Sequence, residues 1–189
     1  QLILNQLLSK EEMLEAIKQT PNKTPGPTGV TVTFFKKFSM KFAILLTRIA
    51  NEAMTEGKTY EFLLQGNISL IPKKEESYKM EDMRPITLLE IARKIITRAM
   101  TNRLKKCLLN EKIIDDQQYC HPERNIDENI LTLLMNIKIA KETNNELHAI
   151  FLDFLKAFDR VNHEYILKVL EKRKFPALFI NFVKTFMKG

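Results

Sequence analysis

The feature that most constrains the fold is an apolar segment that ends in a carboxylate. Residues 147–152 (LHAIFL) predict a buried β-strand, and Asp153 follows directly. Open α/β sheets place their sites at the carboxyl ends of strands, and a buried carboxylate there needs a metal ion or backbone amides around it. By itself, Asp153 fits a ligand, a turn residue or a helix cap equally well. Asp159 could form a carboxylate pair with it, but an Asp ahead of a helix starting near 161–163 fits amide capping better.

Helical periodicity dominates the rest of the chain. It predicts helices over 10–19, 32–56, 88–108, 127–142, 164–172 and 176–188. A second short strand is expected at 67–72, where Pro72 ends an apolar, β-branched run. Ser9 and Glu12 have capping-box spacing, and Gly57 stands where a C-terminal cap belongs. The expected class is therefore a helix-rich α/β (α+β) fold.

Charge favours a polyanionic partner. The chain has 30 Lys and Arg against 23 Asp and Glu, a formal charge of +7, and a pI near 9.3. This balance is typical of nucleic-acid-binding proteins, although a solvated set of lysines would give the same numbers.

Cysteine usage and hydropathy exclude several classes of protein. Cys107 and Cys120, with three scattered histidines, give neither a zinc-ligand spacing nor a disulfide framework. No apolar run has the length of a membrane span, and the first residues lack a signal-peptide pattern. We therefore expect an intracellular protein, cytoplasmic or nuclear, without a membrane partner. Both ends of the sequence are expected to be cuts in a longer chain.

Five motifs, in order, carry a family resemblance. They are KTPGPTG at 23–29, ISLIPK at 68–73, RPITLL at 84–89, DQQYCHPER at 116–124, and FLDFLKAFDRVNH from Phe151. The last contains the pattern Asp-x-x-x-Ala-Phe-Asp after an apolar strand. Together these motifs resemble non-long-terminal-repeat (LINE-type) reverse transcriptases over nearly the whole chain.

The resemblance implies a right-hand polymerase fold. Residues 1–57 would be an N-terminal helical segment with a Pro/Gly loop, 58–145 the fingers, and 146–189 a partial palm. Asp153 would be the first catalytic carboxylate, holding two Mg²⁺ ions with help from the carbonyl of Phe154. Nucleotidyl transfer needs such a pair of metals to activate the primer hydroxyl and neutralise the triphosphate of the dNTP substrate.

Further residues take roles by the same resemblance. Phe158 would lie beneath the incoming sugar and select deoxynucleotides. Spacing alone favours the alternative that Phe158 is an ordinary core residue. Lys73 and Arg84 would meet the triphosphate, for which the Arg donor fork is well suited. The basic side of the 88–108 helix would contact the template phosphates through Lys94, Arg98, Arg103, Lys105 and Lys106. The alternative is that these five side chains form a solvated face.

The sequence also departs from the family. It contains neither the Pro-Gln-Gly segment nor the Ala-Asp-Asp hairpin with the remaining metal ligands, so the palm sheet is expected to be incomplete and the chain inactive alone. RNA template, DNA primer, and the remaining palm and thumb would be its partners. Thr28 replaces the usual Asp of the Pro/Gly loop at 21–29. In the DQQYCHPER motif, Tyr119-Cys120 replaces the usual Gly-Phe.

Two alternatives remain at this stage. One is a non-catalytic basic domain, derived from a decayed element, that binds nucleic acid or protein. The other is an unrelated Mg²⁺-dependent hydrolase built on Asp153 and Asp159.

Overall fold

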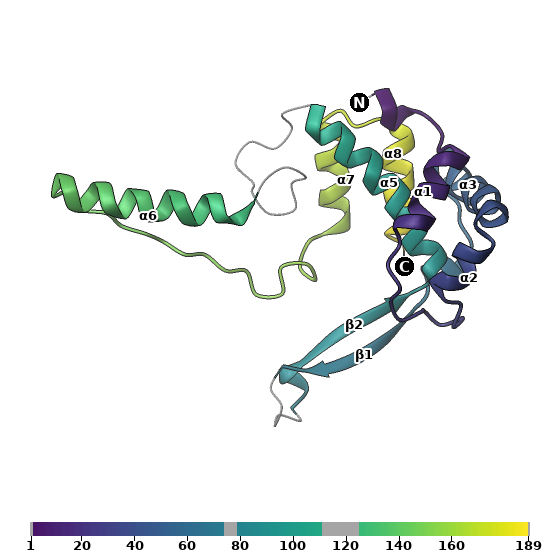
Figure 1. Ribbon diagram of the computed structural model, residues 1–189, viewed down its shortest axis with the longest axis horizontal. Helices are drawn as coiled ribbons and strands as arrows, with labels where there is room; N and C mark the ends of the chain where they lie inside the picture. Colours follow the sequence, from purple (N-terminus) through teal and green to yellow (C-terminus); the bar gives the residue numbers. More distant parts are fainter. Residues whose placement is uncertain (1, 74–78, 111–124, 189) are drawn as a thin grey trace. The chain divides into compact units, whose positions relative to one another are not determined.

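The computed structural model describes residues 2–73, 79–110 and 125–188, which fall into two units (Figure 1). The first unit is Gln1–Arg103 with Leu167–Gly189, and the second is Leu104–Ile166. The division at 57 and 145 expected from the polymerase subdomains stays a prediction. The DQQYCHPER motif at 116–124, which contains Tyr119 and Cys120, lies outside the described residues.

Packed helices form the core of the first unit. Helix α1 (Lys10–Gln19) packs on α3 (Ser39–Thr55), and α3 packs on α8 (Ala177–Phe186). Their apolar stripes are buried, as at Ile17, Ala50 and Phe182, and α5 (Ile91–Asn110) adds a further row. Three short helices complete this part of the chain: η1 (Leu2–Asn5), α2 (Val32–Lys37) and α4 (Glu61–Leu64).

Most predicted helices are confirmed, but one is divided. The single helix expected over 32–56 is wrong, because α2 and α3 are separated at Phe38, whose φ of −112° and ψ of 32° are not helical. Across the break, the ring of Phe34 packs against Phe38 and Phe42, with centroids 5.2 and 5.5 Å apart. Aromatic packing here outweighs the local period. Gly57 has the left-handed φ of 64° expected of a C-terminal cap.

A β-hairpin projects from the helices of the first unit (Figure 1). Strand β1 (Gly66–Pro72), which confirms the strand predicted at 67–72, pairs antiparallel with β2 (Met83–Leu89) after η2 (Met80–Asp82). The sequence pattern does not predict β2, since Leu88 and Leu89 continue the helical period of the segment that follows. Both faces of the hairpin are exposed, with Ile68 at 68%.

The second unit contains α6 (Ile126–Thr143), an irregular segment, and the first turn of α7 (His163–Lys172). The strand predicted at 147–152 is wrong: these residues have no regular structure, and Ile150, Phe151 and Leu152 are 82–83% exposed. A strand needs a neighbour for its N–H and C=O groups, and in the described residues β1 and β2 pair only with each other.

Over the described ranges the fold is thus helix-rich with one small antiparallel sheet, which confirms the predicted class. Among the described helices, none combines the length and the apolar character needed to cross a bilayer.

Candidate active-site and nucleic-acid-binding residues

The segment that carries Asp153 is exposed throughout. Asp153 follows the irregular stretch 145–152, and residues 155–160 form turns in which the Arg160 N–H donates to the Lys156 carbonyl at 3.2 Å. Phe154 is 78% exposed and Phe158 is 95% exposed, so neither is a core residue in this unit. The structure therefore presents this motif to solvent.

Asp159 does not cap the following helix. The residue directly before α7 is Asn162, whose side-chain oxygen accepts a hydrogen bond from the Glu164 N–H at 2.7 Å. The prediction for Asp159 placed the cap three residues too early. Because Asn shares with Asp the preference for helix N-termini, the VNH triplet already contained a suitable capping residue.

The described residues do not assemble a metal centre. No group of three or more His, Cys, Asp or Glu side chains in these ranges is arranged to hold an ion. Asp153 offers hard oxygen ligands of the kind that Mg²⁺ prefers, but a single carboxylate does not make a two-metal site. The donor set in this part of the chain is incomplete.

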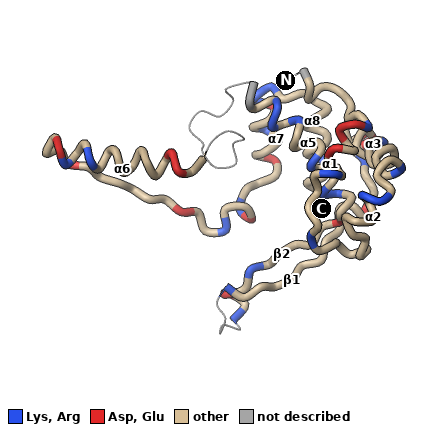
Figure 2. Tube along the Cα trace, viewed as in Figure 1, with Lys and Arg blue, Asp and Glu red and all other residues tan. Residues whose placement is uncertain are grey.

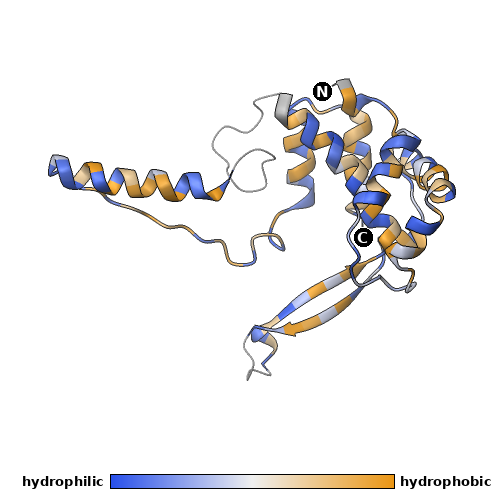
Figure 3. Ribbon diagram, viewed as in Figure 1, coloured by the Kyte–Doolittle hydropathy of each residue, from blue (hydrophilic) through white to orange (hydrophobic). Residues whose placement is uncertain are grey.

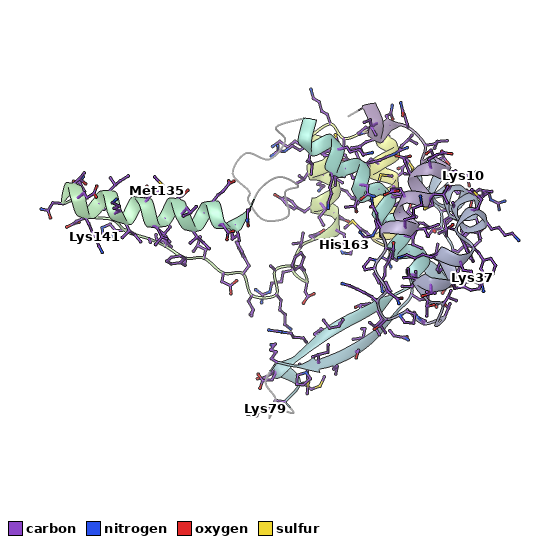
Figure 4. All side chains as sticks on the ribbon, viewed as in Figure 1. Lys10, Lys37, Lys79, Met135, Lys141 and His163 are labelled. Atoms are coloured by element: carbon purple, nitrogen blue, oxygen red, sulfur yellow. The ribbon has the colours of Figure 1, made fainter. Side chains whose placement is uncertain are left out.

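Lys73 and Arg84 both lie at the far end of the hairpin. Arg84 stands opposite Ile71 in the strand register, and Lys73 follows two residues after Ile71. Lys73 is the first residue after β1 and lies in a bend, so both basic residues are at the same end of the hairpin. The Lys73 N–H donates to the Asp82 carbonyl at 2.7 Å, and its Nζ donates to the Glu81 carbonyl at 2.8 Å. Figure 2 shows both basic and acidic positions at this end, where Glu81 and Asp82 lie between Arg84 and Lys79, which is labelled in Figure 4.

The basic residues of α5 differ in accessibility. Lys105 and Lys106 are exposed, whereas Lys94 and Arg98 are half-buried. The Lys94 Nζ donates to the backbone carbonyl of Thr24 at 3.3 Å, so this ammonium group is partly used within the protein. Four of the five predicted phosphate-binding side chains thus retain some solvent access.

Arg103 is a correction to the predicted nucleic-acid contacts. Its side chain is 5% exposed, with its Nε 2.5 Å and its Nη2 2.6 Å from the two carboxylate oxygens of Glu12. The same guanidinium donates to the carbonyls of Ile3, Gln6 and Leu7. It holds the N-terminal segment onto α5 and is not available to a phosphate.

The same carboxylate completes the predicted capping box. Glu12 accepts from the Ser9 N–H at 2.8 Å, and the Glu12 N–H donates to the Ser9 hydroxyl at 3.2 Å. Glu12 therefore links the start of α1 to Arg103 of α5.

Arg93 and Glu90 were missed by the sequence analysis. Arg93 donates to the carbonyls of Leu64 at 3.2 Å and Phe186 at 2.6 Å, and burial lowers the pKa of its guanidinium. Glu90 is buried at 3% exposure between β2 and α5. The available signal was its position in LLEIARKII, where it is the only acidic residue and has apolar neighbours on both sides.

The chain belongs to the reverse transcriptase (RNA-dependent DNA polymerase) family, whose model matches residues 71–188. The matched range includes Lys73, Arg84 and the Asp153 motif, and it confirms the resemblance found on the five motifs.

Within the family, the chain is similar to proteins of transposons. It is 33% identical over 179 residues to the transposon TX1 uncharacterized 149 kDa protein of Xenopus laevis. It is 29% identical over 185 residues to the probable RNA-directed DNA polymerase from transposon BS of Drosophila melanogaster. A retrovirus-related Pol polyprotein from type-1 retrotransposable element R2 of Nasonia vitripennis is 27% identical over 179 residues. These matches cover 93–94% of the chain but only 14–20% of the relatives.

Proposed function

We propose that this chain supplies the fingers and the first palm carboxylate of an RNA-directed DNA polymerase of a retrotransposon. The observation that carries the proposal is the family match over 71–188, a continuous range that contains Lys73, Arg84 and the Asp153 motif. The activity belongs to a longer polypeptide, which adds the remaining palm and the thumb.

Asp153 is the proposed catalytic residue of this chain. Its carboxylate and the backbone carbonyl of Phe154 would each give an oxygen ligand to Mg²⁺, and the remaining ligands would come from outside the described residues. When bound, the two metals supply charge neutralisation at the triphosphate and activation of the primer hydroxyl. Phe154 is 78% exposed and Asp153 is also exposed, so both residues are accessible to those other ligands.

The hairpin is the proposed binding element for the dNTP triphosphate. Arg84 and Lys73 lie at the same end of the hairpin, where two cations could approach the same polyphosphate. Arg84 gives a planar donor fork, whereas the Lys73 Nζ already donates to a carbonyl and would act as a point charge.

Phe158 is the proposed sugar-selecting residue. Its ring is 95% exposed, two positions after Lys156, whose φ of 52° turns the backbone. This exposure supports a contact of the ring with a ligand rather than with a core. A 2′ hydroxyl would collide with it, so deoxynucleotides would be favoured.

Lys94, Arg98, Lys105 and Lys106 are the proposed contacts to the phosphates of the RNA template and DNA primer. Such contacts do not depend on sequence and weaken steeply with salt. Arg103 is excluded from this set, because its donors are used by Glu12 and the N-terminal carbonyls.

Primer extension tests the proposed function. A polypeptide that continues this chain through the palm and thumb should extend a DNA primer on an RNA template when Mg²⁺ and dNTPs are present. The opposing result is salt-dependent RNA binding without extension, which would identify a nucleic-acid-binding module that lacks polymerase chemistry.

A further inference from the structure

We propose that Glu90 is a positioning residue that holds the 21–29 loop through Thr28, and that positions 28 and 90 accommodate one carboxylate between them. Glu90 is 3% exposed. Its Oε1 accepts from the Thr28 N–H at 2.7 Å, and its Oε2 accepts from the Thr28 hydroxyl at 2.6 Å. Both donors are neutral, and both come from a single residue 62 positions away.

The loop lies directly on the backbone that joins β2 to α5. A Cβ on Gly26 would sit 2.6 Å from the Glu90 nitrogen and 2.7 Å from the Leu89 carbonyl carbon, so any side chain would displace the loop. The Gly29 N–H donates to the Gly26 carbonyl at 3.0 Å, which closes a turn around Thr28. Lys94, one turn into α5, fixes the loop at a second point through the Thr24 carbonyl.

The chemistry of the pair limits what can stand at position 28. Both oxygens of Glu90 accept hydrogen bonds from Thr28. An Asp there would bring a second carboxylate, without a proton to donate, to hydrogen-bonding distance in a buried site. The Asp that the family resemblance expects in this loop is therefore incompatible with Glu90, and Thr28 is its matched partner. This inference concerns the base of the hairpin and does not depend on polymerase activity.

A double-mutant comparison in the 189-residue chain tests the pair. Thr28→Asp should lower the folding equilibrium constant, measured by urea unfolding at pH 7.5, on the order of tenfold. Thr31→Asp is the matched control and should cause no loss, because Thr31 is the exposed residue before α2, where Asp is a good cap. Thr28→Asp with Glu90→Gln should recover most of the loss, since an amide can donate to the new carboxylate.

Amide hydrogen exchange tests the positioning role. Glu90→Ala should raise the exchange rate of the Thr28 N–H at least tenfold, whereas Glu52→Ala, which removes an exposed partner of Arg48, should leave it unchanged. The proposal is overturned if Thr28→Asp is as stable as the wild type, if Glu90→Gln gives no recovery, or if the Thr28 amide exchanges equally in Glu90→Ala. The first two outcomes decide the matter even where Glu90→Ala does not fold.

Discussion

At the scale of single residues, Arg93 and Arg103 of α5 use their donors within the protein. Arg103 satisfies Glu12 and three backbone carbonyls, and Arg93 reaches carbonyls at the ends of α4 and α8. Both therefore tie segments that are distant in sequence to one helix. A positive charge in a basic helix is thus not evidence of a phosphate contact unless its donors are accessible.

Arg103→Ala should destabilise the chain by about 3 kcal/mol, because it removes the buried guanidinium that pairs with the half-buried Glu12 carboxylate. Urea unfolding measures the change. Lys106→Ala, on the same helix but exposed, is the control and should change stability by less than about 0.5 kcal/mol. Equal stability of the two variants would contradict the role assigned to Arg103.

Sequence periodicity contained the signal for Arg103. It lies four residues after Ala99 and seven after Ile96, both fully buried in α5, so helical spacing places it on the apolar side. The identity of its partner could not be predicted, because Glu12 is 91 residues away. Spacing likewise could not show that Glu90 meets Thr28, which is a contact made only by the folded chain.

Phe158→Val should reduce discrimination against ribonucleotides in the longer, active polypeptide, because a smaller side chain leaves room for a 2′ hydroxyl. Single-nucleotide incorporation with dNTP and NTP measures the ratio of the two kcat/KM values. We expect that ratio to fall by roughly 100-fold, about 2.7 kcal/mol of lost discrimination. Phe154→Val is the neighbouring control, and an unchanged ratio in Phe158→Val would remove this role.

At the scale of elements, local pattern predicted most of the long helices, which satisfy their own hydrogen bonds, although the helix expected over 32–56 is divided at Phe38. Helix α1 was predicted with its limits, and α6, α7 and α8 to within one or two residues. The strand at 147–152 failed because a strand depends on a partner that the described residues do not supply. The prediction omitted β2 because Leu88 and Leu89 continue the helical period of α5. These residues belong to a strand only through their pairing with β1.

Lys105→Ala with Lys106→Ala should weaken RNA binding and reduce its dependence on salt. Each lost phosphate contact lowers the slope of log K against log salt by about 1, so the pair should lower it by about 2. Filter binding over a range of salt concentrations gives the slope. Lys36→Ala with Lys37→Ala, on exposed positions of α2, matches the charge change and should leave the slope unaffected if α5 is the contact.

At the scale of the whole molecule, a large amount of apolar surface lacks a cover in the described structure. Figure 3 shows apolar residues along α6 and the following segment. Leu131, Leu134 and Met135 are 57–63% exposed, and Ile150 is 83% exposed. Met135 is labelled in Figure 4. Soluble monomers seldom expose such continuous apolar patches, so these residues are suited to packing against the rest of a palm.

The 189-residue chain should therefore self-associate as its concentration rises, which light scattering would detect as an increase in mean mass. Leu131→Lys with Met135→Lys should reduce association without lowering stability, because both side chains are already exposed. A stable monomer at all concentrations would contradict the expectation that this surface is covered in the longer protein.

The rate of single-nucleotide incorporation opposite an RNA template tests the central assignment most directly. In the polypeptide that includes the palm and thumb, Asp153→Asn should lower the rate by roughly 1,000-fold or more, about 4 kcal/mol, with RNA affinity and stability unchanged. Asp159→Asn, six residues further on, should retain most of the rate. Equal rates for Asp153→Asn and the wild type would show that Asp153 is not a ligand of the catalytic metals.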